Sequence, residues 1–295
     1  MSSLVYSTDI LKTRVIVSSD TGIEVIPMAS NVAFLPSRIC FSDCEIYDSL
    51  LDMDFHQFNL RMKYDSLANP EIKGATFEKI KEILDDLVQK GYERFYFILN
   101  NQKTSYYKPL IEKYIHENKN LQSFYFQIKS EGFPVVYMAY EAQKLFELNK
   151  SIPEIEKMLS FLDANNTMYL FSFGEDRIPQ IEKLIDSSLD PFEFDNKNVV
   201  LHILKKNESS IVRIKEKNKT IAPYVDVFLL EMDGKKVIPF FLYTNRFSKY
   251  TEILLKELDK SFPDMKIPIY EMPPYLSLKY GKFSCCVGYI VRYEK

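Results

Sequence analysis

The residues that could do chemistry in this 295-residue chain gather in short polar segments between apolar runs. Asn100, Asn101 and Thr104 follow the apolar run from Phe95 to Leu99 directly. Their amide and hydroxyl groups can donate hydrogen bonds that orient a carboxylate or an amide. The alternative is a solvated loop in which an asparagine caps the next helix. The spacing alone leaves both interpretations open.

Lys279 is the second candidate, since it lies beside Gly281 between the apolar segment 274–276 and an apolar final strand. We expect it in a hairpin loop, where an ammonium group could meet an anionic ligand or could simply be solvated. Asp52 and Asp54 have the spacing of a possible metal pair. Carboxylates just before Phe55 more often lie at a helix N-terminus, where the helix dipole favours them, so we expect no metal there.

Several common kinds of site are excluded by residue type and spacing. The chain has 8 glycines, none at GxG spacing, which argues against a dinucleotide fingerprint or a phosphate-binding loop. The histidines are too far apart for a helical metal pair, and the cysteines match neither a zinc ribbon nor a redox CxxC motif. These residues are His56, His116 and His202, and Cys40, Cys44, Cys285 and Cys286. We therefore predict no metal, no cofactor and no catalysis.

Charge and hydropathy restrict the partners. The 38 basic and 41 acidic residues give a net charge of -3 without a basic block, so nucleic acid is not expected as a partner. The first ten residues lack a secretory signal, and apolar runs such as Val225–Met232 are too short to span a bilayer. We expect a cytoplasmic protein with no stable membrane insertion.

Apolar runs alternate with amphipathic stretches, which is typical of an α/β fold around a largely parallel sheet. The pattern predicts helices and strands in succession between residues 76 and 173. The helices are expected after Thr76, at 105–117 and 135–148, and from the capping-box residue Ser151 to Asp163; the strands are expected at 95–99, 123–128 and 167–173.

Near the front of the chain, short strands are expected at Leu4–Ser7 and Ile23–Ala29, with a helix between them. Ligands of open α/β sheets bind beyond the carboxyl ends of the strands. Ser7 and Thr8 follow the first expected strand. They therefore join the candidate ligand-binding residues.

From about residue 190 the pattern changes to a hairpin followed by alternating helices and strands. The hairpin is expected at 199–204 and 211–215, the helices at 221–232 and 247–261, and the strands at 237–243, 267–271 and 284–292. We therefore predict two domains. Residues 1–178 form an N-terminal α/β domain with a largely parallel βαβ sheet, and residues 179–295 form a second, smaller α/β domain.

Motifs along nearly the whole chain resemble those of the DegV family of bacterial fatty-acid-binding proteins. The matching segments are Gly22–Met28 with the family's GIxVVPL strand, Leu67–Phe77 with PTTSQPSPGDF, Lys90–Leu99 with EGYDxILVI, Asn100–Tyr107 with SSGLSGTY, and Glu271–Tyr289 with EIGPVIGTHTGPGALGVAY.

The resemblance implies a two-domain α/β carrier that holds one long-chain fatty acid between its domains and presents the carboxylate to a separate fatty-acid kinase. The family's carboxylate contacts come from TSQ, from the SS motif and from GTHxGPG. Asn69, Asn101 and Lys279 occupy these positions here, and each can donate a hydrogen bond to a carboxylate.

Two other function classes remain possible at this point. One is a diverged paralogue that has lost the ligand and acts as a structural or regulatory interaction protein. The other is an α/β enzyme acting on a small metabolite, which has little support because no nucleophile–base pair can be named.

Overall fold

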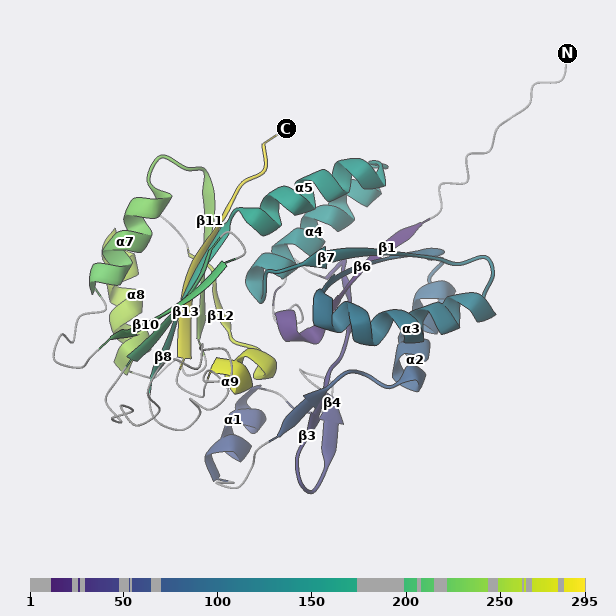
Figure 1. Ribbon diagram of the computed structural model, residues 1–295, viewed down its shortest axis with the longest axis horizontal. Coiled ribbons are helices and arrows are strands. Elements are labelled where there is room, and N and C mark those ends of the chain that lie inside the picture. Colours follow the sequence, from purple (N-terminus) through teal and green to yellow (C-terminus); the bar gives the residue numbers. More distant parts are fainter. Residues whose placement is uncertain are drawn as a thin grey trace, which may run out of the picture.

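The computed structural model describes residues 12–22, 26, 30–47, 53, 55–64, 70–173, 199–205, 208–214, 222–243, 249–261, 263, 267–280 and 284–294. The expected strand at 4–7 and the candidate residues Ser7, Thr8 and Asn69 lie outside these ranges. Two larger sheets and one small sheet make up the strand architecture (Figure 1). The α/β class is confirmed.

The first sheet is parallel throughout and has the order β2-β1-β6-β7. Its strands are β1 (Thr13–Ser18), β2 (Ala33–Leu35), β6 (Arg94–Asn100) and β7 (Gln122–Ile128). Phe95 to Leu99 in β6 are all buried, as expected for a central strand with helices over both faces. The predicted strand there is confirmed.

The second sheet has the order β10-β9-β8-β13-β11-β12 and is antiparallel except for the pair of β11 with β12. Its strands are β8 (Asn166–Phe173), β9 (Val199–Lys205), β10 (Glu208–Ile214), β11 (Val237–Tyr243), β12 (Ile269–Glu271) and β13 (Ser284–Val291). The predicted hairpin is the pair of β9 and β10, although Glu208 already belongs to β10 rather than to the turn.

A small antiparallel sheet with the order β4-β3-β5 extends from the first sheet. Its strands are β3 (Arg38–Cys40), β4 (Glu45–Tyr47) and β5 (Glu71–Lys73), and α1 (Phe55–Tyr64) packs against it. Leu278 of the C-terminal part joins their apolar cluster. The small sheet therefore packs against α1 and against the C-terminal part of the chain.

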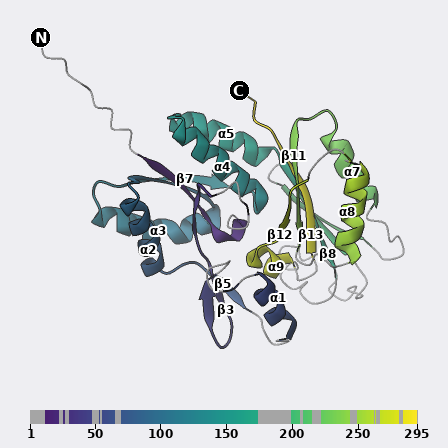
Figure 2. The same cartoon turned by 180° about the vertical axis from the view of Figure 1, so that it is seen from behind.

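Helices cover the faces of both larger sheets (Figures 1 and 2). The pair α2 and α3 packs on one face of the first sheet, and the pair α4 and α5 lies between the two sheets in a shared apolar core. The pair α7 and α8 packs on the outer face of the second sheet. The bounds are α2 (Phe77–Gln89), α3 (Asn101–Glu117), α4 (Phe133–Glu147), α5 (Ile152–Ala164), α7 (Ala222–Met232) and α8 (Lys249–Ser261).

Local capping fixes where several helices begin. Thr76 accepts a hydrogen bond from the backbone of Lys79 at the start of α2. Ser151 and Glu154 form the predicted capping box of α5. Each cap satisfies backbone N–H groups that have no partner within the helix, which stabilises that helix by about 1 kcal/mol.

A side-chain amide completes the pairing of β1. The short β2 pairs only with Ile16, Val17 and Ser18, so within the described part of the chain no strand lies beside the first half of β1 on that side. The buried Gln143 of α4 accepts a hydrogen bond from Val15 N at 2.8 Å and donates one to Thr13 O at 3.3 Å. Its amide thus takes the place of a peptide group of the missing neighbour.

Two sequence-based expectations near the candidate loops are wrong. The segment 13–18 is strand β1 rather than a helix, because its β-branched run packs on both faces of a sheet. The strand beside it is Ala33–Leu35, and the expected strand Ile23–Ala29 lies outside the described residues except for Ile26, which belongs to no strand. Lys279 lies in α9 (Pro274–Tyr280) instead of a hairpin loop.

The chain passes from the first sheet to the second between α5 and β8, at residues 165–166. The strand β8, which we expected at the end of the first unit, pairs with β9 and β13. The predicted boundary between residues 178 and 179 lies outside the described residues.

Candidate functional site

A cluster of polar side chains lies where the four strands of the parallel sheet end. The 3₁₀ turn η1 (Ser19–Thr21) follows β1, Ser37 follows β2, Lys103 lies in the first turn of α3 after β6, and Glu131 follows β7. The carboxyl ends of parallel strands meet at one edge of the sheet, which is where open α/β folds bind ligands. The helix α9 of the C-terminal part lies over this edge (Figure 1).

Three of these residues form a chain of hydrogen bonds. The backbone N–H of Ser37 donates to Ser19 Oγ at 2.9 Å, and Lys103 Nζ donates to Ser37 Oγ at 3.0 Å. Ser19 and Ser37 are fully buried, and the exposed fraction of Lys103 is 8%. The lysine therefore brings a positive charge into the junction between β1, β2 and β6.

Helix α3 positions this lysine. Asn100 caps the helix by accepting a hydrogen bond from Lys103 N at 2.9 Å, which places Lys103 in the first turn. Unpaired N–H groups at a helix N-terminus attract anions, so the electrostatic potential there is positive, like the charge of the ammonium group. The nitrogen also lies 5.3 Å from the ring centroid of Tyr275 in α9.

Close packing holds α9 over the site. A Cβ on Gly22 would lie 3.3 Å from Pro273 Cδ, and a Cβ on Gly132 would lie 3.1 Å from Leu276 Cδ1. Both glycines have positive φ, which other residues adopt at a cost. Glycine at these two positions lets the loops after β1 and β7 approach α9 closely.

An ion pair closes the other side of the cluster. Lys279 Nζ lies 2.5 Å from Glu131 Oε1, and the hydroxyl of Tyr280 donates to Glu131 Oε2 at 3.1 Å. Burial, and then the neighbouring Glu131 carboxylate, raise the pKa of Tyr280 well above its usual value, so its hydroxyl keeps its proton. Lys279 therefore already has a carboxylate partner within the chain.

The structure places the described candidate residues at different points of this region. Asn100 acts as a helix cap, which the sequence left as an alternative. The buried Thr104 donates to Asn100 O at 2.9 Å, while the exposed Asn101 accepts a weak hydrogen bond from Gln127 at 3.5 Å. Lys279 lies on α9, paired with Glu131. Asn69, Ser7 and Thr8 lie outside the described residues.

The sequence reasoning missed the residues that form most of the cluster. These are Ser19, Ser37, Lys103, Glu131 and Tyr275. One signal was available: the polar segment 18–21 follows directly on the β-branched run 15–17, as a strand followed by a ligand loop would. The ambiguous assignment of that run as a helix removed it from consideration.

Apolar side chains begin directly beside these polar groups. Leu276 and Tyr280 of α9, Met272 before it and Phe133 after Glu131 all belong to the core shared by the two larger sheets. Among the described residues no group of three His, Cys, Asp or Glu could hold a metal ion. A buried ammonium next to an apolar region suits an amphiphile with an anionic end.

None of the described helices is long and apolar enough to cross a membrane.

Comparisons with known proteins give a consistent picture of the fold. No family model matches the sequence, and no curated protein matches it. Solved structures match over nearly the whole chain. DegV from Bacillus subtilis, described as a fatty acid binding protein, is 14% identical with a TM-score of 0.74, and the match covers 96% of this chain and 100% of that one.

The descriptions of two other solved structures name a fatty acid. A stearic-acid-binding protein from Eubacterium ventriosum is 13% identical with a TM-score of 0.75, covering 95% of this chain and 98% of that one. A DegV family protein from Eubacterium eligens, loaded with heptadecanoic acid, is 10% identical with a TM-score of 0.72, covering 95% and 100%. This chain shares their fold from end to end.

Proposed function

We propose that this chain, which has the fold of the DegV family, binds one long-chain fatty acid at the junction of its two larger sheets. The carboxylate lies at the polar cluster beneath α9. The acyl chain follows the apolar side chains that start beside it. The fatty acids named for the structural neighbours support this ligand class.

The observation that carries the proposal is the burial of Lys103. A charge-assisted hydrogen bond from an ammonium group to a carboxylate is strong, and the more so where little water surrounds it. Only 8% of Lys103 is exposed, at the carboxyl ends of the parallel strands and beside an aromatic ring. A fatty-acid carboxylate placed here would accept hydrogen bonds from this ammonium group and from the helix N-terminus.

The other headgroup contacts follow from the family resemblance. Asn69, Asn101 and Lys279 stand at the family's carboxylate-binding positions. Thr104 and Asn100 lie in the same turn as Lys103, and Ser7 and Thr8 belong to the expected first loop. We include these residues as secondary contacts, and single substitutions would rank their contributions to lipid affinity.

The protein acts as a carrier in this proposal, and the chemistry on the carboxylate belongs to another protein. The resemblance implies a separate fatty-acid kinase as that partner. A carrier needs a site that opens to its partner, and α9 is the element that covers the carboxylate end.

Mass spectrometry tests the ligand directly. The purified protein is measured under native conditions and again after solvent extraction. A fatty acid at close to one per chain supports the proposal and gives the acyl length. If no lipid is found and added oleate also leaves the melting temperature unchanged, the proposal is wrong, because ligand binding must stabilise the folded state.

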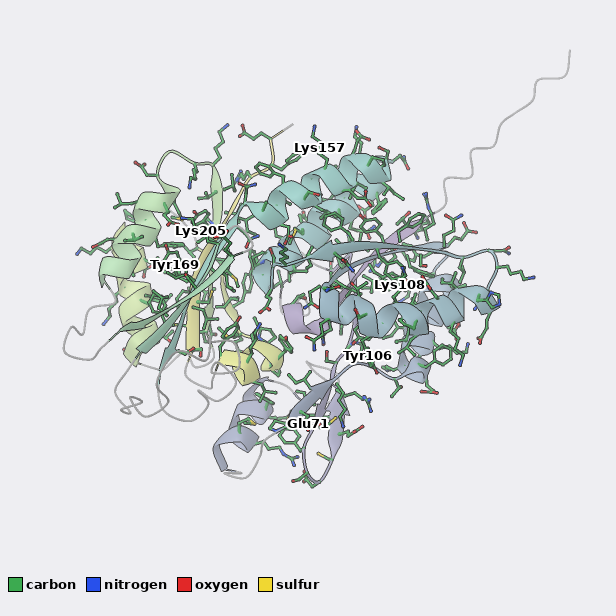
Figure 3. All side chains as sticks on the ribbon, in the orientation of Figure 1. Glu71, Tyr106, Lys108, Lys157, Tyr169 and Lys205 are labelled. Atoms are coloured by element: carbon green, nitrogen blue, oxygen red, sulfur yellow. The ribbon has the colours of Figure 1, made fainter. Side chains whose placement is uncertain are left out.

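A matched pair of variants tests the assignment of the headgroup. Lys103→Met keeps the length of the side chain and removes its charge, and we expect oleate affinity to fall about tenfold or more. Lys157→Met makes the same change on the exposed face of α5 (Figure 3) and should leave affinity unchanged. Equal affinities of both variants would mean that the carboxylate binds elsewhere.

One observation favours a second candidate, a ligand-free relative that serves as an interaction protein. Lys279, at the position of the family histidine, is already paired with Glu131 and packs beside the buried Tyr280. An internal carboxylate can thus take the place of a ligand's carboxylate. Failure of both lipid measurements above would select this candidate.

A further inference from the structure

The outer edge of β7 is an unpaired strand edge in the parallel sheet, because β7 stands last in the order β2-β1-β6-β7. An exposed edge offers free N–H and C=O groups to any other strand, and proteins usually protect edges by shortening them or by adding charges. The other edge of this sheet, β2, has three residues. The strand β7 has seven residues, Gln122 to Ile128, and none is charged.

The remaining described edge strands are protected in one of these ways. The strand β10 carries Glu208 and Arg213, and the three-residue strands β4, β5 and β12 each carry a charge. Among the described edge strands that are longer than three residues, only β7 therefore has no charged residue. Its four central residues, Ser123 to Phe126, are only partly buried.

The edge of β7 forms the floor of a groove between two helices. Tyr125, Phe126 and Gln127 line the groove from the strand. One wall is α3, including Lys108 and Glu112, and the other is α5, including Glu156. Figure 3 labels Lys108 on the α3 wall. The groove therefore follows the free edge of the sheet.

The sequence of β7 reads almost the same in both directions about Tyr125. Phe124 and Phe126 flank it, and Ser123 and Gln127 come next. In an antiparallel pair of two β7 strands centred on Tyr125, Phe124 would oppose Phe126 of the second copy, and Ser123 would oppose its Gln127. Aromatic pairs and hydrogen-bonding pairs are the combinations that stabilise antiparallel strands.

The charges near Tyr125 suit the same arrangement. Lys108 Nζ lies 5.2 Å from the Tyr125 ring centroid and 3.7 Å from Glu112, so charges of both signs lie beside the centre of the strand. A twofold axis perpendicular to the sheet would bring α3 beside α3 of the second copy, with Lys108 able to reach the other Glu112.

We propose that β7 is the interface of a symmetric dimer, in which two copies of this chain pair their β7 strands antiparallel about Tyr125. The two four-stranded sheets then form one continuous eight-stranded sheet. The interface is isologous, which closes the assembly at two chains. It lies on the edge of the sheet rather than at its carboxyl ends, so the proposal does not depend on lipid binding.

Sedimentation velocity of the full chain over a range of concentrations tests this. We expect a reversible dimer in the wild type. The double variant S123K/Q127K places lysine opposite lysine twice, and we expect the dimer to dissociate about tenfold more readily or more. The variant S123K/Q127E places lysine opposite glutamate twice and should restore the dimer. The circular dichroism spectrum of each variant checks its fold.

A monomeric wild type at every concentration overturns the proposal. So does a dimer that the lysine pair leaves intact, or one that the lysine–glutamate pair fails to restore, because the register is then wrong. If the variants do not fold, hydrogen exchange of the wild type decides. Amides of β7 must exchange more slowly as the protein concentration rises, and the absence of that change overturns the dimer.

Discussion

The ammonium nitrogen of Lys279 lies 2.5 Å from a carboxylate oxygen of Glu131, although the two residues are 148 positions apart in the chain. Glu131 follows β7 in the first sheet, and Lys279 belongs to α9, which precedes β13 of the second. Both side chains are 21% exposed. The pair therefore connects the two larger sheets at the candidate site.

Removing the carboxylate of this pair should strengthen lipid binding. In Glu131→Gln the ammonium of Lys279 loses its internal partner, and a fatty-acid carboxylate can replace it. We expect oleate affinity to rise about fivefold, which corresponds to about 1 kcal/mol for a partly exposed ion pair. Titration with a fluorescent fatty acid measures this. Glu117→Gln on the exposed end of α3 is the control. Unchanged affinity would mean that Lys279 does not contact the headgroup.

Two glycines each pack against an aromatic ring, and the two rings differ in how easily they can move. A Cβ on Gly288 would lie 2.2 Å from Cζ of the fully buried Phe240 and 2.7 Å from the backbone oxygen of Thr167. A Cβ on Gly74 would lie 2.0 Å from the ring of Tyr106, which is 42% exposed. Gly288→Ala should lower the free energy of unfolding by about 2 kcal/mol or more, since the buried Phe240 ring and the backbone of Thr167 cannot move aside.

Gly74→Ala, in contrast, should cost less than about 1 kcal/mol, because the Tyr106 ring can turn toward solvent and loses only the hydrogen bonds of its hydroxyl to Gly74 O and Ala75 O. Urea unfolding of both variants measures the two values. Equal losses would mean that the Tyr106 ring is held as firmly as the Phe240 ring.

The four cysteines should divide into two reactivity classes. Cys285 and Cys286 are fully buried in β13, and burial raises the pKa of both thiols. Cys40 and Cys44 are partly exposed. Because the thiolate is the reacting form, a brief treatment with iodoacetamide should modify at most two cysteines in the native protein and all four in guanidinium chloride. Intact-mass measurement counts the labels. A third label in the native protein would contradict the burial of β13.

The Asp85 carboxylate should make stability depend on pH in the acid range. Hydrogen bonds from Lys81 and then from Tyr114 lower the pKa of Asp85 in the folded state. A lowered folded-state pKa stabilises the protein above the unfolded value of about 4, and this contribution is lost as the pH falls through the folded value. Asp85→Asn should therefore have a lower urea midpoint than wild type at pH 7.

The two midpoints should converge only as the pH falls through the folded-state pKa of Asp85, which lies below the unfolded value of about 4, because both chains then carry a neutral group at this position. Tyr114→Phe removes one of the two hydrogen bonds and should lie between them at pH 7. A difference between wild type and Asp85→Asn that persists unchanged at low pH would rule out the titration of Asp85 as its cause.

Amphipathic periodicity was sufficient to predict most elements from residue 76 onward. The helix after Thr76, the buried strand before Asn100 and the capping box at Ser151 rest on local patterns, and the structure confirms each. The front of the chain was harder. The β-branched segment 13–18 is buried on both faces, so it lacks the alternation that marks a half-exposed strand.

The candidate site depended on contacts that local patterns do not encode. Lys103 is buried because α9 and Ser37 happen to meet at the first turn of α3, and Ser37 is 66 positions away in the chain. A lysine in a polar segment gives no sign of such burial. Lys279 was a candidate from the sequence, and the structure places it in α9, but the sequence offered no reason to expect Glu131 as its partner.

The amide of Gln143 has a consequence for the order in which the chain acquires its structure. It hydrogen-bonds Val15, which lies 128 positions earlier. A ribosome releases residues from the N-terminus onward, so β1 emerges long before the group that completes its pairing. Until α4 has been synthesised and docked, Val15 N–H and Thr13 C=O remain open to any nearby strand. The strand β1, the first of the described strands to be made, is thus among the last to be closed, and this interval during synthesis favours mispairing of β1.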